Sequence, residues 1–158
     1  MKIKHLLACL LLPVASCALA EPFTVSADGQ EVTDAKTGLI WRRCAEGMTA
    51  SGGTCTGTAS AFTHEAALTR ASTQATTAAM AWRLPNVKEL SSIVDRNRIN
   101  LTIDTAAFPA TPANWFWSSS PSVVNAVSAW GVDFGYGFVD GGYSRSNSYN
   151  VRLVRAGQ

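Results

Sequence analysis

The chain has few of the residues on which catalysis usually depends. Among its 158 residues are two histidines and four cysteines, and charged residues make up only 15%. A Ser/His/Asp nucleophile would have to use His64, around which there is no catalytic motif. The carboxylates Glu46 and Glu65 have no evident reason to lie together as an acid/base pair. We therefore expect a protein that is not an enzyme and needs no cofactor.

Long apolar runs are also absent. Leu6 to Leu12 is far shorter than the ~20 residues that cross a hydrocarbon core, and no later stretch approaches that length. Two lysines precede this run and Ala18-Leu19-Ala20 follows it, as in a cleavable secretion signal. We predict that residues 1–20 are such a signal, with cleavage after Ala20, and that the product is secreted or periplasmic.

The same segment contains an alternative processing site. Val14-Ala15-Ser16-Cys17 resembles a bacterial lipobox, in which the cysteine is lipidated and becomes the new N-terminus. Lipidation at Cys17 would anchor the protein to a membrane, whereas cleavage after Ala20 would release it. The alternatives stay open here, and neither changes the fold of the following residues.

Removal of the signal changes the charge of the protein. The full chain has 13 basic and 11 acidic residues, a formal net charge of +2. Lys2 and Lys4 leave with the signal, and all acidic residues follow residue 20, so the remainder is neutral. We expect residues 21–158 to form one domain without affinity for nucleic acid.

Only two cysteines follow the signal, Cys44 and Cys55. In a protein that folds outside the cytoplasm, this pair predicts one disulfide bond. Closing so short a loop stabilises the fold by roughly 3 kcal/mol in the chain-entropy model. A zinc site lacks ligands, because His64 is the one histidine beside those thiols. We expect no bound metal.

Turn signals and apolar spacing predict short strands and then two helices. Residues 21–44 alternate short apolar groups with tight turns, which is typical of strands. Apolar spacing predicts a helix from Phe62 to about Ser72. Asn86 followed by Glu89 resembles a capping box and predicts a second helix.

The second half of the chain predicts a long loop and a sheet. Residues 96–114 have no apolar period, and we expect a loop pinned to the core by Ile103 and Phe108. From Trp115 onwards, alternating aromatic residues and glycines predict C-terminal antiparallel hairpins. The fold class is therefore α+β with segregated elements, two helices and long loops.

Several motifs in this chain have the order and spacing of a known family. They are Thr37-Gly38-Leu39-Ile40-Trp41 before Cys44, Cys55-Thr56-Gly57, Trp82-Arg83-Leu84-Pro85-Asn86 leading to Glu89-Leu90, Trp117-Ser118-Ser119-Ser120, Trp130-Gly131-Val132-Asp133-Phe134, and Val151-Arg152-Leu153-Val154-Arg155. From about residue 29 to 155 the chain resembles the Lcl C-terminal domain family, named for a bacterial collagen-like adhesin. The resemblance implies a C-type-lectin-like fold that presents loops on one side.

The resemblance also implies binding at a cell envelope, because the naming adhesin is associated with sulfated glycosaminoglycans. This chain has no collagen-like Gly-X-Y stretch, so trimer avidity is not implied. Its neutral charge after residue 20 removes the simplest argument for a polyanionic ligand. The sugar-binding triplets Glu-Pro-Asn, Gln-Pro-Asp and Trp-Asn-Asp of calcium-dependent lectins do not occur here.

Three arginines lie inside these motifs: Arg83, Arg152 and Arg155. They would contact an anion in a functional interpretation. We favour a structural one, because a guanidinium has five donors and bridges loop carbonyls and carboxylates. Asp133 and Asp104 are the partners that we expect.

Four tryptophans occupy periodic or strand-like motifs: Trp41, Trp82, Trp117 and Trp130. Residues of this size in such positions usually pack in a core, and we predict a structural role for all four. A ligand platform is the alternative.

The segment from Tyr136 to Tyr149 has a different composition, with aromatic and polar residues among glycines and serines. This is typical of a recognition surface, although an ordinary hairpin with inward rings is the alternative. We predict a non-catalytic, adhesin-like binding module that recognises a glycan or a cell-surface protein here. A structural or assembly component of an envelope complex is the other interpretation. The candidate ligand-binding residues are Tyr136, Phe138, Asp140, Tyr143, Arg145, Asn147 and Tyr149.

Overall fold

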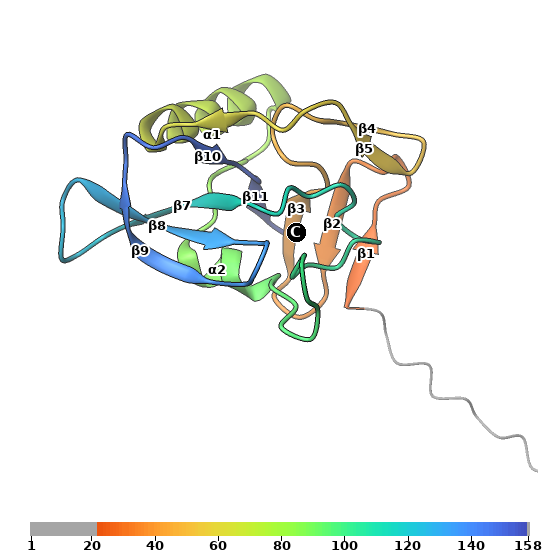
Figure 1. The fold of residues 1–158 in the computed structure, drawn as a ribbon. Coiled ribbons are helices and arrows are strands. Elements are labelled where there is room, and N and C mark those ends of the chain that lie inside the picture. The colour runs from red at the N-terminus through yellow and green to blue at the C-terminus, as the bar shows by residue number, and fades with distance from the viewer. Residues whose placement is uncertain (1–21, 158) are drawn as a thin grey trace, which may run out of the picture.

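A computed structural model describes residues 22–157, which form two helices and three sheets (Figure 1). The predicted secretion signal and the alternative lipidation site Cys17 lie outside the described residues. The strands are β1 (Phe23–Val25), β2 (Glu31–Asp34), β3 (Leu39–Arg42), β4 (Thr49–Ser51), β5 (Thr54–Thr56), β6 (Ala61–Phe62), β7 (Trp115–Pro121), β8 (Ser128–Asp133), β9 (Val139–Ser144), β10 (Tyr149–Asn150) and β11 (Val154–Ala156), and the helices are α1 (His64–Ala78) and α2 (Val87–Ser92).

The first sheet joins the two ends of the described chain. Its order is β1-β2-β3-β11, and all of its pairs are antiparallel. Val32, Trp41 and Val154 lie side by side in it and are fully buried. We expected the last strand to belong to the C-terminal sheet, and this was wrong. The chain returns instead to β3, because an unpaired edge beside the buried Trp41 offers it a ladder.

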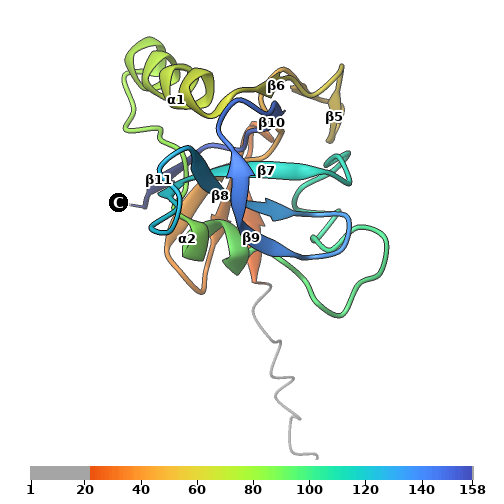
Figure 2. The same ribbon diagram turned by 60° about the vertical axis from the view of Figure 1, so that its left-hand side comes forward.

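The second sheet has the order β6-β10-β7-β8-β9. The antiparallel pairing predicted for the C-terminal hairpins is confirmed for β7, β8 and β9. It is wrong for β10, which runs parallel to β7. After β9 the chain crosses over through residues 145–148 and enters the sheet on the far side of β7 (Figure 2). A hairpin makes the next strand antiparallel to the one before it, whereas a crossover of this kind makes it parallel.

The first helix differs in its bounds from the prediction. It begins after Thr63, whose Oγ1 accepts a hydrogen bond from the backbone N of Ala66 at 3.3 Å, so Phe62 belongs to β6. It continues to Ala78 and ends where Ala79 adopts a left-handed conformation with φ 50°. The apolar spacing of Ala67 and Ala71 continues with Ala75 and Ala78, which pack against the same cluster, so the helix extends beyond the predicted end.

The second helix is confirmed at its predicted cap. The side chain of Asn86 accepts from the backbone N of Glu89, and the Glu89 carboxylate accepts from the backbone N of Asn86. The two helices lie on opposite sides of β7 (Figures 1 and 2). Phe116 packs in the same cluster as Leu90 of α2, and Trp117 packs with Ala67 of α1.

The long loop is confirmed as well. Residues 93–114 contain neither helix nor strand, and Ile103 and Phe108 are fully buried. Phe108 meets Phe23 of β1 edge to face at 5.2 Å. The loop thus closes the core over the first sheet.

Candidate functional site

Cys44 and Cys55 form the predicted disulfide bond. It closes the segment that carries the short β4–β5 hairpin. Within the described residues, no three side chains of histidine, cysteine, aspartate or glutamate gather where they would hold a metal ion. None of the helices in this range is long and apolar enough to cross a membrane.

Three of the four tryptophans are buried: Trp41, Trp82 and Trp117. The core prediction is wrong for Trp130, which is half-buried. Residue 130 lies at irregularities of register towards both β7 and β9, where its neighbours Ala129 and Gly131 pair and it does not. A bulge re-aims its side chain, and the Trp130 ring covers Gly141 instead of entering the core.

Arg152 is completely buried, and its guanidinium donates hydrogen bonds to backbone carbonyl groups. Its Nη1 donates to the carbonyl oxygens of Arg42, at 2.9 Å, and Arg43, and its Nη2 donates to Oγ1 of Thr111 at 2.7 Å. The guanidinium also lies 4.8 Å from the centre of the Phe108 ring. Burial lowers its pKa to about 9, so the group stays charged at neutral pH. Arg152 therefore ties the end of β3 to the long loop.

The other two arginines pair with glutamates, not with the aspartates that we expected. Arg83 makes two hydrogen bonds of 2.7 Å with Glu89, which lower the pKa of that carboxyl group. Arg155 donates to Glu31 at 2.6 Å. Asp133 and Asp104 accept instead from backbone N–H groups two or three residues further on. Their short side chains hold local turns, and Asp104 also lies 3.9 Å from Arg98, but in the range that the structure describes neither pairs with Arg83, Arg152 or Arg155.

The seven candidate ligand-binding residues form two groups. Tyr136 and Phe138 lie in the turn between β8 and β9, 69% and 62% exposed, with ring centres 6.1 Å apart. Asp140 is also exposed, and its carboxylate accepts from the backbone N of Gly142 at 2.9 Å. These three do not contact the remaining four through their rings or hydrogen bonds within the described residues.

The second group forms an aromatic surface with a residue that the sequence interpretation missed. The rings of Tyr143 and Tyr149 lie 5.3 Å apart, and Trp115 of β7 lies 4.3 Å from Tyr143 and 6.4 Å from Tyr149. All three are half-buried. We call Trp115, Tyr143 and Tyr149 the aromatic surface. The sequence signal for Trp115 was the alternation of side chains along β7, which places Trp115 on the same side of the strand as Trp117 and opposite to Phe116.

Polar groups border the aromatic surface. Asn147 donates from Nδ2 to the Tyr149 hydroxyl at 3.2 Å, and Arg145 donates from Nε to the carbonyl oxygen of Ser128 at 3.2 Å. Burial raises the pKa of Tyr143, with a further contribution from the Asp140 charge, so its hydroxyl remains a donor at neutral pH. Rings edged by adaptable donors are typical of recognition surfaces.

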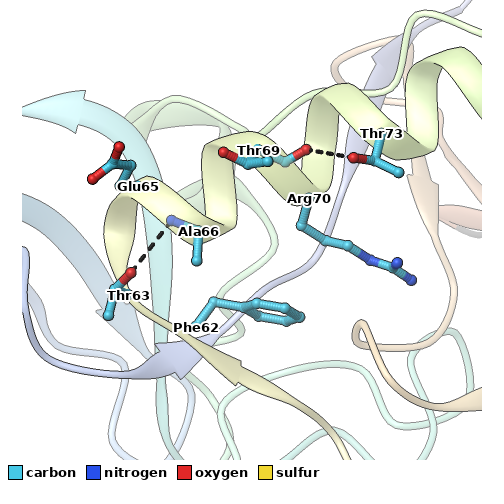
Figure 3. A pocket seen from close by; sticks show the side chains of 7 residues that line it. All are labelled: Phe62, Thr63, Glu65, Ala66, Thr69, Arg70 and Thr73. Atoms are coloured by element: carbon cyan, nitrogen blue, oxygen red, sulfur yellow. Dashed lines mark hydrogen bonds between the residues drawn. The ribbon is translucent and has the colours of Figure 1, made fainter.

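Two hollows lie along α1. One, of about 450 Å³, is lined by Arg145, Ser146 and the first residues of α1. The other, of about 530 Å³, lies between β6 and α1 (Figure 3). Phe62 and Arg70 project into it, and Phe62 is the strand partner of Tyr149. Thr63 and Glu65 line both hollows, so the two adjoin at the start of α1.

His64 is 3% exposed and is engaged in the core. Its Nε2 donates to the carbonyl oxygen of Ser118 at 3.0 Å, and its ring meets Trp117 edge to face at 5.3 Å. Burial lowers the pKa of the imidazole below its usual value of 6.5, so the ring is neutral at pH 7.

The sequence was also compared with known proteins. No curated protein matches this chain. One protein family does, described as the Lcl C-terminal domain, and it covers residues 30–155. This range contains the central strands of the two larger sheets, the disulfide and the aromatic surface. The chain therefore belongs to the Lcl C-terminal domain family.

Proposed function

We propose that this chain is an exported, non-catalytic binding module of the bacterial cell envelope, and that it recognises a glycan through the aromatic surface. The observation that carries the proposal is the cluster of Trp115, Tyr143 and Tyr149. Half-buried aromatic rings are held in place by packing and still offer their faces to a ligand, which reduces the entropy lost on binding.

The chemistry around the rings favours a sugar as the ligand. A pyranose presents an apolar face of C–H groups and a rim of hydroxyls. The three rings match the first, and Arg145, Asn147 and the tyrosine hydroxyls supply donors and acceptors for the second. An adhesin-like role and a C-type-lectin-like fold, as in the protein that gives the family its name, form part of the same proposal.

Export is supported by the disulfide Cys44–Cys55, because such bonds persist in oxidising compartments. The absence of catalysis is argued from His64, whose Nε2 is occupied by the Ser118 carbonyl oxygen within the core. A general base must reach the proton that it abstracts. The product is thus proposed to be secreted, periplasmic or lipid-anchored, and to bind without turnover.

A second candidate function is assembly into an envelope complex, and a different feature favours it. The turn between β7 and β8 exposes Val123 by 93%, Val124 by 91% and Val127 by 64%. Burial of exposed valines at a loop tip by a partner protein lowers the free energy, because apolar surface is removed from water. This loop would then be the contact with a protein subunit.

A glycan array distinguishes the two. The exported protein should bind a defined subset of glycans, Tyr143→Ala should lose that binding, and Tyr136→Ala, an exposed tyrosine outside the aromatic surface, should keep it. Silence on the array, together with co-purification of an envelope partner that depends on Val123 and Val124, would support assembly instead.

A further inference from the structure

A polar hollow of about 250 Å³ lies between the middle of α1 and the segment after β3. It shares Arg70 with the hollow of Figure 3 but contains none of the aromatic-surface residues. Residues 44–50 form one wall of it. The polar side chains that line it are Gln30, Arg42, Glu46, Thr49, Arg70 and Gln74. We call these residues the polar hollow.

Arg42 is the unusual member, because the carboxylate nearest to it in the sheet is bonded to another arginine. Glu31 lies directly opposite Arg42 in the β2–β3 ladder, but its carboxylate accepts from Arg155 at 2.6 Å. In the described part of the chain Arg42 forms no ion pair, and its buried Nε has no hydrogen-bond partner. A guanidinium with unused donors at a hollow is a candidate to bind a ligand.

Arg42 is nevertheless held in a fixed position. Its Cζ atom lies 4.5 Å from the centre of the Trp82 ring, which is 2% exposed. Contact with the ring limits the movement of the guanidinium, and because Nε is buried, the Nη groups are the donors that can reach a ligand. The unused donors are therefore preorganised.

The opposite wall carries a second oriented arginine. Arg70 donates from Nε to Oε2 of Glu46 at 2.6 Å, and Glu46 is only 7% exposed. Within residues 22–157 this bond engages Nε alone, so both Nη groups of Arg70 remain for a ligand. Gln74, one turn further along α1, adds an uncharged amide. Two arginines and one glutamate give the hollow a net charge of about +1.

We propose that the polar hollow binds a carboxylate group, with Arg42 as its principal donor and Arg70 as the second. A planar fork of N–H groups matches the two oxygens of a carboxylate, which accepts from both at once. The size of the hollow suits the end of an acidic sugar or the C-terminus of a peptide. This site is independent of the aromatic surface.

The test is an NMR titration of the folded, disulfide-bonded protein with sodium glucuronate, N-acetylglycine, glucose and sodium sulfate. Saturable shifts of the backbone signals of residues 44–50 and Gln74 are expected with one or both carboxylates and not with glucose. Response to glucuronate alone assigns an acidic sugar, response to N-acetylglycine alone assigns a peptide C-terminus, and either supports the proposal. Equal response to glucose or to sulfate, or no response to either carboxylate, overturns it.

Variants locate the site. Arg42→Gln should weaken carboxylate binding at least tenfold, whereas Arg98→Gln, which removes an exposed arginine paired with Asp95, should leave it unchanged. Gln74→Glu adds a negative charge to the wall without touching the Trp82 stack, and should weaken binding by a similar factor if Arg42→Gln unfolds the protein. Unchanged affinity in a folded Gln74→Glu or Arg42→Gln protein contradicts the assignment.

Discussion

The rings of Trp115 and Tyr143 lie 4.3 Å apart although their strands, β7 and β9, are separated by β8. Tyr143 lies opposite Ala129 of β8, and two residues further on a Cβ atom at Gly131 would lie 3.3 Å from Cε3 of Trp115. The glycine therefore leaves space above β8 for the Trp115 ring.

A neighbouring glycine gives the first prediction. A Cβ atom on Gly141 would lie 2.5 Å from Cε2 of Trp130, whereas one on Gly142 would have no contact closer than 3.4 Å. We expect Gly141→Ala to lower the free energy of unfolding by about 1–3 kcal/mol through overpacking. Urea denaturation measures this, and Gly142→Ala is the matched control. Equal stability of the two variants would show that Trp130 moves aside without cost.

Arg152 gives the second prediction. Arg152→Met should lower the free energy of unfolding by roughly 3 kcal/mol, because it leaves two carbonyls and the Thr111 hydroxyl buried without their donor. Arg152→Lys should recover part of the loss, since one ammonium cannot reach all three acceptors. Denaturation of both proteins is the measurement, and wild-type stability of the methionine variant would refute the role of Arg152 as a buried tie.

His64 makes stability depend on pH. Its folded pKa lies below the unfolded value of 6.5, so the unfolded chain binds the proton first. The stabilisation is complete above pH 6.5 and is lost as the pH falls below it. Between pH 7.5 and 5.5 we expect a loss of up to about 1 kcal/mol. His64→Gln keeps a donor for the Ser118 carbonyl oxygen and should remove this dependence in urea titrations at the two pH values; a persistent slope would assign it to other groups.

The disulfide gives a prediction about the unfolded chain. Cys44 and Cys55 are 11 residues apart, and opening so short a loop should cost roughly 3 kcal/mol of stability. Mass spectrometry of the non-reduced exported protein should find the two cysteines joined, and Cys44→Ala/Cys55→Ala should unfold at lower urea concentration. Free thiols in the exported protein would contradict both the bond and the proposed compartment.

Local signals in the sequence predicted much of this fold. The Asn86–Glu89 cap, the cysteine pair and the loop pinned by Ile103 and Phe108 were found because each depends on a few neighbouring residues. The return of β11 to β3 and the parallel entry of β10 were not, because pairing between distant strands leaves no local pattern.

The candidate site was predicted in part for the same reason. The composition of residues 136–149 indicated aromatic and polar groups. It did not indicate that Tyr143 and Tyr149 pack with Trp115, apart from Tyr136 and Phe138. The role of Arg42 could not be predicted, because it depends on the pairing of its neighbour Glu31 with Arg155, and that pairing follows from the arrangement of strands in the sheet.

The proposal of glycan binding is tested most directly by isothermal titration of the strongest array ligand into three folded proteins: wild type, Tyr143→Ala and Tyr136→Ala. Removing a central aromatic contact should weaken binding at least tenfold in Tyr143→Ala, about 1.4 kcal/mol or more, with Tyr136→Ala at the wild-type affinity. Wild-type affinity in Tyr143→Ala, with the loss in Tyr136→Ala instead, would contradict the aromatic surface as the binding site.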